Sequence, residues 1–442
     1  MVKAADQPTF YLLNLGCAKN LVEGEHLAGM LLSHGFQAVA DLSAAQWLLV
    51  NTCGFLTSAI EENIDYILEL ASAKKAEQKL VVVGCLVGRF GKKLQRSLPE
   101  VDLFISPGQV QMLPQLLAAM PASGLALAPV SGILGFTTPR VISTGPGWAY
   151  LRLSDGCASN CFFCAIPHIR GKLRSRPLDD IIKEAAFMGT QGIKEINLVA
   201  QDVSAYGQDL GIQDGLLHLL QKLEQIPQIN WIRLLYLHPA VLRPIFLQAM
   251  CAFKKVLPYF DIPLQHIATK VLTHMGRLHT SEELMANLGL LRALLPQSII
   301  RSTLMVGHPG EDEEEFNQLI DFISDFKFDH LGCFMFEPQP GTKSAKLPRV
   351  AKKIARQRQK KIMSIQKKIR RVHSRSLAGT EQSMLFLGNH PQSEQLGWGR
   401  LWSQAPEVDG TVIVVDGQAA PGTIVRVRIL KAHDYDYEAA IF

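Results

Sequence analysis

The chain has 442 residues, of which 48% are hydrophobic and 19% charged, and a formal net charge of +5. This length and composition predict two or three globular domains with packed cores and exclude a largely disordered chain. The first ten residues have no apolar signal core, and no run approaches the roughly 18 uncharged apolar residues of a membrane-spanning helix. We therefore expect a cytoplasmic protein, whose eight cysteines serve as ligands, catalysts or buried apolar side chains rather than disulfides.

Charge is unevenly distributed along the chain. Residues 339–380 contain fourteen Lys or Arg and no acid, whereas residues 380–442 contain four Lys or Arg and eight Asp or Glu. A basic segment therefore lies between two mildly acidic parts, and this asymmetry constrains the partner more than the total charge does.

The first predicted domain covers residues 8–125. Short apolar runs (FYLLNL, WLLVN, LVVVG and LFIS) alternate with amphipathic stretches such as residues 21–34 and 57–73. Apolar runs separated by segments of helix length predict crossover units and a parallel sheet, so this part is expected to be an α/β domain. The stretch SGILGFTTPRVISTGPG, rich in Gly, Pro, Ser and Thr, predicts a linker, which we place at residues 126–147.

The second predicted domain covers residues 148–347, where the same alternation resumes. Helical segments, such as 177–189 and 311–326, fall between six strand-like runs, at 149–154, 193–200, 231–237, 257–262, 298–306 and 329–336. Six repeats without a seventh and eighth predict an open, partial (β/α)6 barrel.

Two further segments follow the predicted barrel. Residues 348–376 have apolar positions mostly at helical spacing on a basic background, which predicts a basic linker helix. Residues 377–442 contain short strand-like runs with Gly turns (MLFLG, LGWGRLW, DGTVIVVDG and PGTIVRVRIL), which predict a small antiparallel β-barrel.

Three cysteines, Cys157, Cys161 and Cys164, lie within eight positions of the stretch SDGCASNCFFCAIP. Thiolates from one loop can converge on a metal centre, but structural zinc and ferredoxin-type 4Fe-4S clusters both take four protein ligands. A cluster with three protein ligands leaves one iron open, and S-adenosylmethionine, with its amino and carboxylate groups, is a suitable chelator for it. The alternative is a zinc loop completed by a distant ligand.

The C-x3-C-x-F-C pattern of this loop, with Phe163 before the last cysteine, resembles the signature loop of radical S-adenosylmethionine (SAM) enzymes. The resemblance implies that the three cysteines are both metal ligands and the catalytic centre. It also implies that Phe163 lies near the nucleoside of the cofactor.

Cys17, Cys53 and Cys85 each follow an apolar run of the first domain, with a glycine adjacent to each. Ligand sites of open α/β sheets gather at the carboxyl ends of strands, and glycine allows a bulky group to approach the backbone. We interpret the three cysteines as ligands of an auxiliary cluster. The alternative is that they are buried small side chains, which is our interpretation for Cys251 and Cys333.

The chain has two sets of three cysteines, each without a fourth ligand. In this it resembles the methylthiotransferase family, in which a three-cysteine domain, a radical SAM barrel and a TRAM barrel occur in this order. The matching stretches are LGCAKN, VNTCGF and VVVGCL, followed by DIPLQH, RSTLMVGHPGE and PGTKSA. The resemblance implies two 4Fe-4S clusters, one releasing a 5'-deoxyadenosyl radical from SAM and the other delivering a methylated sulfur. It further implies that SAM is also the methyl donor and that flavodoxin or ferredoxin supplies electrons.

Within this family the stretches LGCAKN, SDGCASNCFFCAIPHIRGKLRSRP and APEVDG look most like the branch that modifies small-subunit ribosomal protein S-twelve. That branch adds a methylthio group to the β-carbon of one aspartate. Ala18, His168 and His308 depart from the residues usual there, which leaves local substrate contacts open. The alternatives are a tRNA adenosine methylthiotransferase and, from another class, a non-catalytic iron-sulfur scaffold or electron carrier that docks on ribosomes.

The charge of the terminal barrel bears on this choice. A barrel that grips RNA should be basic, whereas this one is net negative and would suit a basic ribosomal protein, unless its acids only form a solvated face. The acids in question are Glu407, Asp409, Asp416, Asp434, Asp436 and Glu438. The basic helix could contact ribosomal RNA near the substrate or be a solvated linker.

Six further residues are candidates for cofactor contacts: Gln201, Asp202, Gln265, His266, Arg301 and Gly307. The first two follow a predicted strand, where the loops of such barrels carry function, although a plain turn is the alternative. The next two follow DIP, where a histidine is often only a packing residue. Arg301 could neutralise the methionine carboxylate or the target aspartate, or form a strand-end salt bridge. Gly307 could let the backbone lie along the adenosine.

Overall fold

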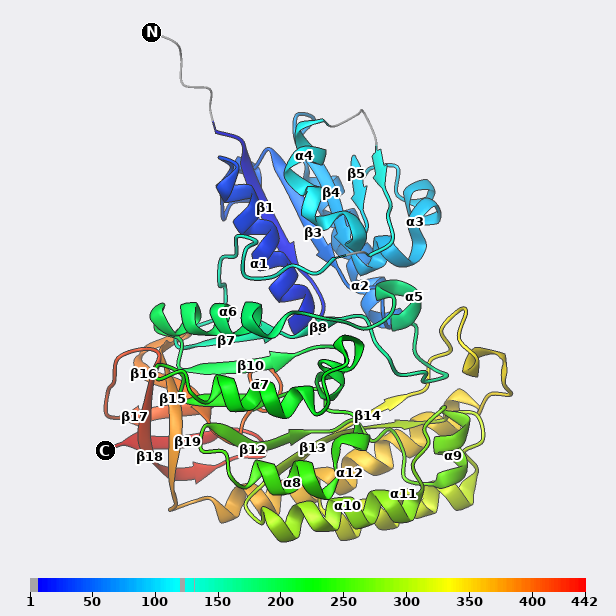
Figure 1. The fold of residues 1–442 in the computed structure, drawn as a ribbon, viewed down its shortest axis with the longest axis vertical. Helices are drawn as coiled ribbons and strands as arrows, with labels where there is room; N and C mark the ends of the chain where they lie inside the picture. Colours follow the sequence, from blue (N-terminus) through cyan, green and yellow to red (C-terminus); the bar gives the residue numbers. More distant parts are fainter. Residues whose placement is uncertain (1–6, 120–123, 131) are drawn as a thin grey trace. The chain divides into compact units, whose positions relative to one another are not determined.

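The structure is a computed structural model that describes residues 7–119, 124–130 and 132–442 (Figure 1). Residues 120–123, within the first predicted domain, and residue 131, within the predicted linker, lie outside this description. The chain divides into two compact units, which are described one at a time. The first comprises Met1–Ser143, Ser154–Ala158 and Ala165–Ile181, and the second comprises Thr144–Leu153, Ser159–Cys164 and Ile182–Phe442.

The first unit contains a six-stranded sheet in the order β2-β1-β3-β4-β5-β6, and every neighbouring pair is parallel. This confirms the predicted parallel α/β fold. The strands are β1 (Thr9–Asn14), β2 (Gln37–Ala38), β3 (Trp47–Thr52), β4 (Lys79–Gly84), β5 (Leu103–Ile105) and β6 (Gly124–Ala126). The helices are α1 (Ala18–Ser33), α2 (Thr57–Ala73), α3 (Cys85–Ser97), α4 (Leu113–Ala118) and α5 (Ile166–Arg170), and the 3-10 turns are η1 (Leu42–Ala44) and η2 (Pro107–Met112).

Helices cover both faces of this sheet. Alternate residues of the strands pack on one side with α1 and α4, as Leu49 does with Leu31, and on the other with α2 and α3, as Leu48 does with Ile67. Because both faces are buried, the strands are nearly continuous apolar runs rather than alternating ones. A two-stranded antiparallel ribbon of β8 (Ser154–Asp155) and β9 (Arg174–Ser175) also belongs to this unit.

The second unit contains a six-stranded parallel sheet in the order β14-β13-β12-β11-β10-β7, as expected for a partial (β/α)6 barrel. The strands are β7 (Trp148–Arg152), β10 (Glu195–Val199), β11 (Trp231–Leu234), β12 (Val256–Asp261), β13 (Ile299–Val306) and β14 (His330–Met335). Its helices are α7 (Gly215–Leu223), α8 (Pro244–Met250), α9 (Thr269–His274), α10 (Ser281–Leu294) and α11 (Glu313–Phe326). Helix α6 (Leu178–Thr190) begins in the first unit and ends in the second, and the 3-10 turns are η3 (Val203–Ala205), η4 (Gln208–Leu210), η5 (Pro239–Val241) and η6 (Ser344–Lys346).

The basic helix α12 (Lys352–Ser376) packs against β14 and α11 and leads into a closed five-stranded barrel in the order β15-β16-β17-β19-β18. Its strands are β15 (Glu381–His390), β16 (Ser393–Leu401), β17 (Val412–Asp416), β18 (Thr423–Ala432) and β19 (Tyr437–Ile441). The sequence did not predict β19, which pairs in parallel with β17. A closed ring with an odd number of strands cannot alternate in direction throughout, so the barrel is antiparallel except for this pair.

Buried charged side chains join the terminal barrel to the larger barrel within the second unit. Arg400 donates to Glu195 at 2.8 Å, and Asp409 lies 3.0 Å from His330 Nδ1 and pairs with Arg301. The Tyr259 hydroxyl also donates to Asp409. A carboxylate buried among these donors has its charge compensated without access to solvent.

The acids of the terminal barrel are therefore largely used within the molecule. Glu407 accepts a hydrogen bond from Tyr150 at 2.9 Å, Asp434 pairs with Arg371, and Glu438 with His433. Asp436 accepts from the backbone N–H of Thr411, and of the six acids singled out in the sequence Asp416 is the one left exposed without a side-chain partner among the described residues. These acids therefore do not form a free acidic surface for a basic partner.

Two other features concern the rest of the described chain. No helix within it combines the length and apolar character needed to cross a bilayer. The prediction that Cys251 and Cys333 are buried is right for Cys333 and wrong for Cys251, which is exposed. The reason is that α8 ends at Met250, so Cys251 lies just past its last turn.

We expect Asp409→Asn to destabilise the second unit by about 3 kcal/mol, because the change leaves Arg301 and His330 beside an uncharged group in a buried site. The measurement is the urea midpoint of unfolding, followed by tryptophan fluorescence. Asp416→Asn, at the exposed acid of the same barrel, is the matched control and should change stability by less than about 0.5 kcal/mol. Equal midpoints for the two variants would contradict the structural role of Asp409.

Candidate functional site

The three cysteines of the first unit lie at one edge of its sheet. Cys17, Cys53 and Cys85 follow the carboxyl ends of β1, β3 and β4, which are neighbours in the sheet. Cys17 is the N-cap of α1, and Cys85 is the first residue of α3. The partial positive charge of a helix N-terminus favours a thiolate, so these positions suit sulfur ligands.

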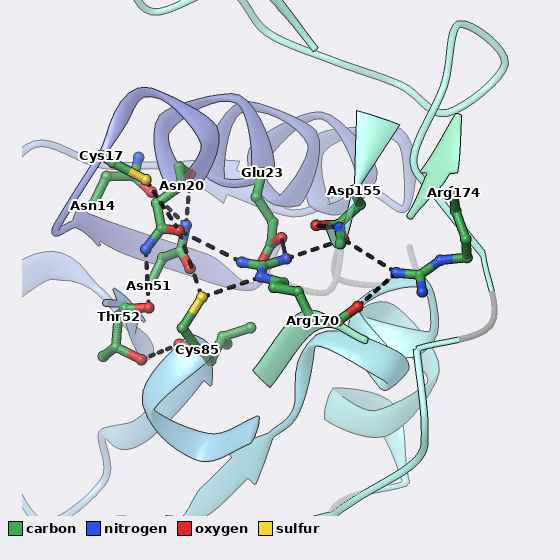
Figure 2. Close-up of polar contacts among 12 residues, drawn as sticks. Asn14, Cys17, Asn20, Glu23, Asn51, Thr52, Cys85, Asp155, Arg170 and Arg174 are labelled. Carbon is green, nitrogen blue, oxygen red and sulfur yellow. Dashed lines mark hydrogen bonds and ion pairs between the residues drawn. The ribbon is translucent and has the colours of Figure 1, made fainter. Parts of the chain in front are cut away.

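A buried asparagine lies between two of these cysteines (Figure 2). The Oδ1 atom of Asn20 is 4.0 Å from Cys17 Sγ and 3.9 Å from Cys85 Sγ. Its Nδ2 donates to the carbonyls of Leu15 (3.1 Å) and Thr52 (2.9 Å), and the residue is 2% exposed. The carboxamide is therefore held in one orientation, with both sulfurs beside the same oxygen.

Arg170, the last residue of α5, also contacts this site (Figure 2). Its Nε donates to Cys85 Sγ at 3.1 Å, and its Nη1 lies 2.5 Å from Glu23 and 3.5 Å from Asp155. Its Nη2 is 3.5 Å from Asn20 Oδ1. We did not single out Arg170 or Asn20 from the sequence. Arg170 is 85 residues from Cys85, and no local pattern relates them.

The three thiols have different proton affinities. Burial raises the pKa of Cys17, but the charge of Lys19 and nearby backbone N–H groups outweigh it, so the pKa is lowered overall. Burial raises the pKa of Cys53, and it raises that of Cys85 to about 12 despite the opposing charge of Arg170. Cys17 is therefore the most acidic of the three thiols, and Cys85 holds its proton most tightly.

The glycines beside these cysteines allow strand ends to pack together. A Cβ at Gly16 would lie 2.7 Å from Cys53 Cβ, and one at Gly54 would lie 2.7 Å from the carbonyl oxygen of Cys85. We expected these glycines to admit a bulky group to the backbone. The structure instead fills the space with the neighbouring cysteine segments, so the glycines bring the three cysteines close to one another.

The loop with Cys157, Cys161 and Cys164 is divided between the units, and each part is described within its own unit. In the first unit, Gly156 follows β8 with φ +71°, and a Cβ there would lie 2.0 Å from the carbonyl oxygen of Lys172. The backbone N–H of Cys157 donates to the carbonyl of Gly171 at 3.3 Å. The strand pair β8–β9 thus fixes the backbone on which Cys157 sits.

In the second unit, Cys161 and Cys164 border an apolar cluster beside α9. Phe163 is 9% exposed and packs in this cluster with Ala268, Val271 and Met275. The backbone N–H of Phe162 donates to the carbonyl of Met275 at 2.9 Å. Phe163 therefore anchors the loop in the protein interior, and its predicted proximity to a nucleoside stays a prediction.

The first four candidate cofactor contacts lie at carboxyl ends of barrel strands. Asp202 follows β10 and accepts from Ser204 N at 2.9 Å, and burial raises its pKa. Gln265 has φ +71° and bonds through its backbone to Thr303 and Met305 on β13. His266 is buried, its Nδ1 accepts from Ala268 N at 3.0 Å, and burial lowers its pKa to about 3. Gln201 directly precedes Asp202.

The other two candidates lie on or beside β13. Arg301 is the third residue of this strand and pairs with Asp409, and its Nε lies 3.9 Å from Asp261 Oδ1. These contacts favour the salt-bridge alternative left open by the sequence. Gly307 follows the strand with φ +75°, and a Cβ there would lie 2.6 Å from Ala355 Cβ. Gly307 is therefore required for the approach of α12, whatever else contacts it.

A residue that we did not predict, Arg277, also lies near these strand ends. It follows α9 and is 8% exposed, and its Nε and Nη1 have no hydrogen-bond partner among the described residues. Burial raises the pKa of Asp202 and lowers that of His238; the charge of Arg277 opposes the first change and adds to the second. A buried guanidinium with unpaired N–H groups is suited to an anionic ligand.

Within the same described ranges, no three His, Cys, Asp or Glu side chains are close enough together to hold a single metal ion. The fit to a cluster therefore depends on the donor set. Each site has three cysteines and no further ligand assigned, and in the first unit all three lie at one sheet edge. This donor set fits an iron-sulfur cluster with one open iron better than a four-ligand zinc site.

We expect Gly84→Ala to remove the iron of the first unit, lowering the content from about eight to about four atoms per chain. Gly84 has φ +104°, and a Cβ would lie 2.8 Å from Asn51 Oδ1 and 2.9 Å from the carbonyl oxygen of Thr52, which would displace Cys85. The measurement is iron and sulfide counting on anaerobically purified protein. Gly192→Ala is the control, because Gly192 has φ +87° but open space around it. Full iron content in Gly84→Ala would show that this backbone position is not needed.

Comparisons with known proteins agree with this arrangement. Three family models match in chain order: Uncharacterized protein family UPF0004 at residues 9–106, the Radical SAM superfamily at 151–323 and the TRAM domain at 379–441. A solved structure of the radical SAM methyltransferase TsrM from Kitasatospora setae, with cobalamin and a [4Fe-4S] cluster bound, has a TM-score of 0.57 over 77% of each chain. At 14% identity, this likeness concerns the fold alone.

Two relatives are similar over nearly their whole length, and both are named ribosomal protein uS12 methylthiotransferase RimO. The protein from Syntrophobacter fumaroxidans is 41% identical over 435 residues, covering 97% of this chain and 98% of the relative. The protein from Myxococcus xanthus is 40% identical over 436 residues, covering 98% and 91%. This chain belongs to the RimO family of radical SAM methylthiotransferases.

Proposed function

We propose that this chain transfers a methylthio group to the β-carbon of an aspartate of ribosomal protein uS12, with SAM as methyl donor and radical source. The observation that carries the proposal is the set of three cysteines at one edge of the first sheet, two of them beside the same Asn20 oxygen. The chain adds to this set the separate loop of Cys157, Cys161 and Cys164. A second three-cysteine site distinguishes sulfur insertion from radical chemistry alone.

The residues of the chain have separate tasks in this proposal. When bound, the cluster of Cys157, Cys161 and Cys164 supplies the electron that cleaves SAM, and that of Cys17, Cys53 and Cys85 supplies the sulfur to be methylated. Phe163, packed against α9, keeps water from one side of its loop. Gln201, Asp202, Gln265, His266 and Gly307 line strand ends where βα loops of such barrels contact their ligands.

We further propose that Arg277 binds a carboxylate. Both the target aspartate and the methionine end of SAM carry one, and a guanidinium binds carboxylates through charge-assisted N–H bonds. Among the described residues, Arg277 Nε and Nη1 are buried without a hydrogen-bond partner, and because they lie on different sides of the guanidinium each is available for its own charge-assisted bond. Arg301, in contrast, is already paired with Asp409.

We expect Arg277→Gln to raise the KM for one carboxylate-bearing substrate by at least about tenfold, the effect of losing one charge-assisted contact. The formation of 5'-deoxyadenosine is then measured in the absence of uS12. Impaired formation identifies SAM as the ligand of Arg277, whereas normal formation identifies uS12. Arg277→Lys should recover part of the affinity, because lysine keeps the positive charge but lacks the planar set of N–H donors of a guanidinium. The control is Arg243→Gln, at an exposed arginine paired with Asp214. Unchanged KM values for both substrates would exclude Arg277 from binding.

We propose two further partners. A low-potential flavodoxin or ferredoxin is the electron donor, because each turnover needs electrons that the chain does not itself generate. Ribosomal RNA near uS12 contacts α12, whose exposed side chains include nine Lys or Arg and no acid: Lys352, Lys353, Arg356, Lys360, Lys361, Lys367, Lys368, Arg371 and Arg375. Phosphate contacts of this kind weaken steeply with salt.

We expect uS12 to lose its methylthio group in cells that lack this chain, as measured by mass spectrometry of the intact protein. Expression of the wild-type chain or Cys251→Ala should restore the modification, whereas the triple alanine variant of Cys17, Cys53 and Cys85 should not. Loss of methylthio-adenosine from tRNA with uS12 still modified would support the tRNA alternative instead. Absence of 5'-deoxyadenosine from the reduced, reconstituted protein would support a non-catalytic scaffold.

The contact of α12 with RNA is tested by the salt dependence of activity on small subunits and on free uS12. A steeper fall with salt on small subunits than on free uS12 supports this contact.

A further inference from the structure

We propose that Arg170 is a positioning residue of the auxiliary cluster. Arg170 binds the Cys85 sulfur directly and thereby raises the reduction potential of that cluster. The inference rests on the proposed function, since it takes Cys17, Cys53 and Cys85 as cluster ligands. It goes further because it assigns a role to an arginine, which is not among the expected cluster ligands. All the contacts that support it lie within the first unit (Figure 2).

The guanidinium of Arg170 is held against the Cys85 sulfur. Arg170 Nε donates to Cys85 Sγ at 3.1 Å, and the residue is 3% exposed. The guanidinium is held from its other side, because Nη1 lies 2.5 Å from Glu23 and Nη2 lies 3.5 Å from Asn20 Oδ1. A side chain fixed at both ends cannot turn away from Cys85 without leaving a buried charge unpaired.

Arg170 belongs to the chain segment that follows the loop of Cys157, Cys161 and Cys164. It lies six residues after Cys164, and its partner Asp155 lies two residues before Cys157. Gly171, with φ +77°, lets the chain turn directly after Arg170. The two ends of the cysteine loop are therefore tied to each other and to the auxiliary site through one guanidinium.

The positive charge of Arg170 bears on the reduction potential of the cluster. Reduction adds one negative charge to a cluster, and a cation that donates a hydrogen bond to a ligand sulfur stabilises the reduced form more than the oxidised form. Burial strengthens this effect, because no water screens the charge. Arg174 provides a comparison: it lies 3.7 Å from Asp155 and is partly exposed, but it donates to the carbonyl of Arg170 rather than to a cysteine.

The test uses the full chain with Cys157, Cys161 and Cys164 replaced by alanine, so that only the auxiliary cluster remains, with about four irons. The midpoint potential of this cluster is measured by redox titration followed by electron paramagnetic resonance. We expect Arg170→Gln to lower the reduction equilibrium constant about tenfold, which is about 59 mV for one electron. Arg174→Gln, the matched control, should leave the potential unchanged. A wild-type potential and iron content in Arg170→Gln would overturn the proposal.

Two further outcomes are distinguishable. If Arg170→Gln does not fold, Arg170→Lys decides, because lysine keeps the charge but cannot reach Cys85, Glu23 and Asp155 together. A changed resonance signal at normal iron content then supports the proposal, and an unchanged signal and potential reject it. If the parent protein with Arg170 intact binds no iron, the auxiliary cluster itself is wrong, and the proposed function fails with it.

Discussion

The register of three neighbouring parallel strands is the constraint on which the first unit depends. Asn14 of β1 pairs with Asn51 of β3, and Thr52 of β3 pairs with Gly84 of β4, so the three strands end side by side. A shift of one residue in any strand would invert its side chains and withdraw its cysteine from the others. The apolar contacts on both faces of the sheet therefore position the cysteines as well as stabilise the fold.

The polar groups around those strand ends complete the site. Asn20 lies beside two of the sulfurs, and Arg170 contacts Cys85, Glu23 and Asp155. Each of these groups is buried and has several partners, so its orientation is determined before any ligand binds. The glycines next to the cysteines serve the same purpose, since a side chain at Gly16 or Gly54 would force the cysteine segments apart.

A second buried network gives the terminal barrel a structural task. Asp409 pairs with Arg301 and Glu195 pairs with Arg400 across the two barrels of the second unit, so the terminal barrel is joined to the larger one by compensated charges. The acids that the sequence offered as a docking surface for a basic protein are mostly engaged within the chain. Recognition of a basic ribosomal protein must then depend on other surfaces. Helix α12 exposes many basic side chains, so its charge is complementary to an acidic partner instead.

Much of the fold could be predicted from the sequence because it depends on local periodicity. The parallel sheet, the six barrel strands, the basic helix and the terminal barrel all follow from runs of apolar residues and their spacing. The prediction missed β19, because YEAAI is short and is recognisable as a strand only once β17 and β18 flank it. Cys251 was wrongly predicted as buried, because burial there depends on where α8 ends.

The sequence by itself determined which residue types are present and how they are spaced: two sets of three cysteines, each without a fourth, in the order typical of the family. Only the tertiary structure decided which distant groups surround them. Arg170 and Cys85 are separated by 85 residues and Asn20 and Cys85 by 65, and such pairs meet only when the sheet is folded. The physical reason is that spacing along a loop is a local property, whereas a buried ion pair depends on the packing of the whole unit.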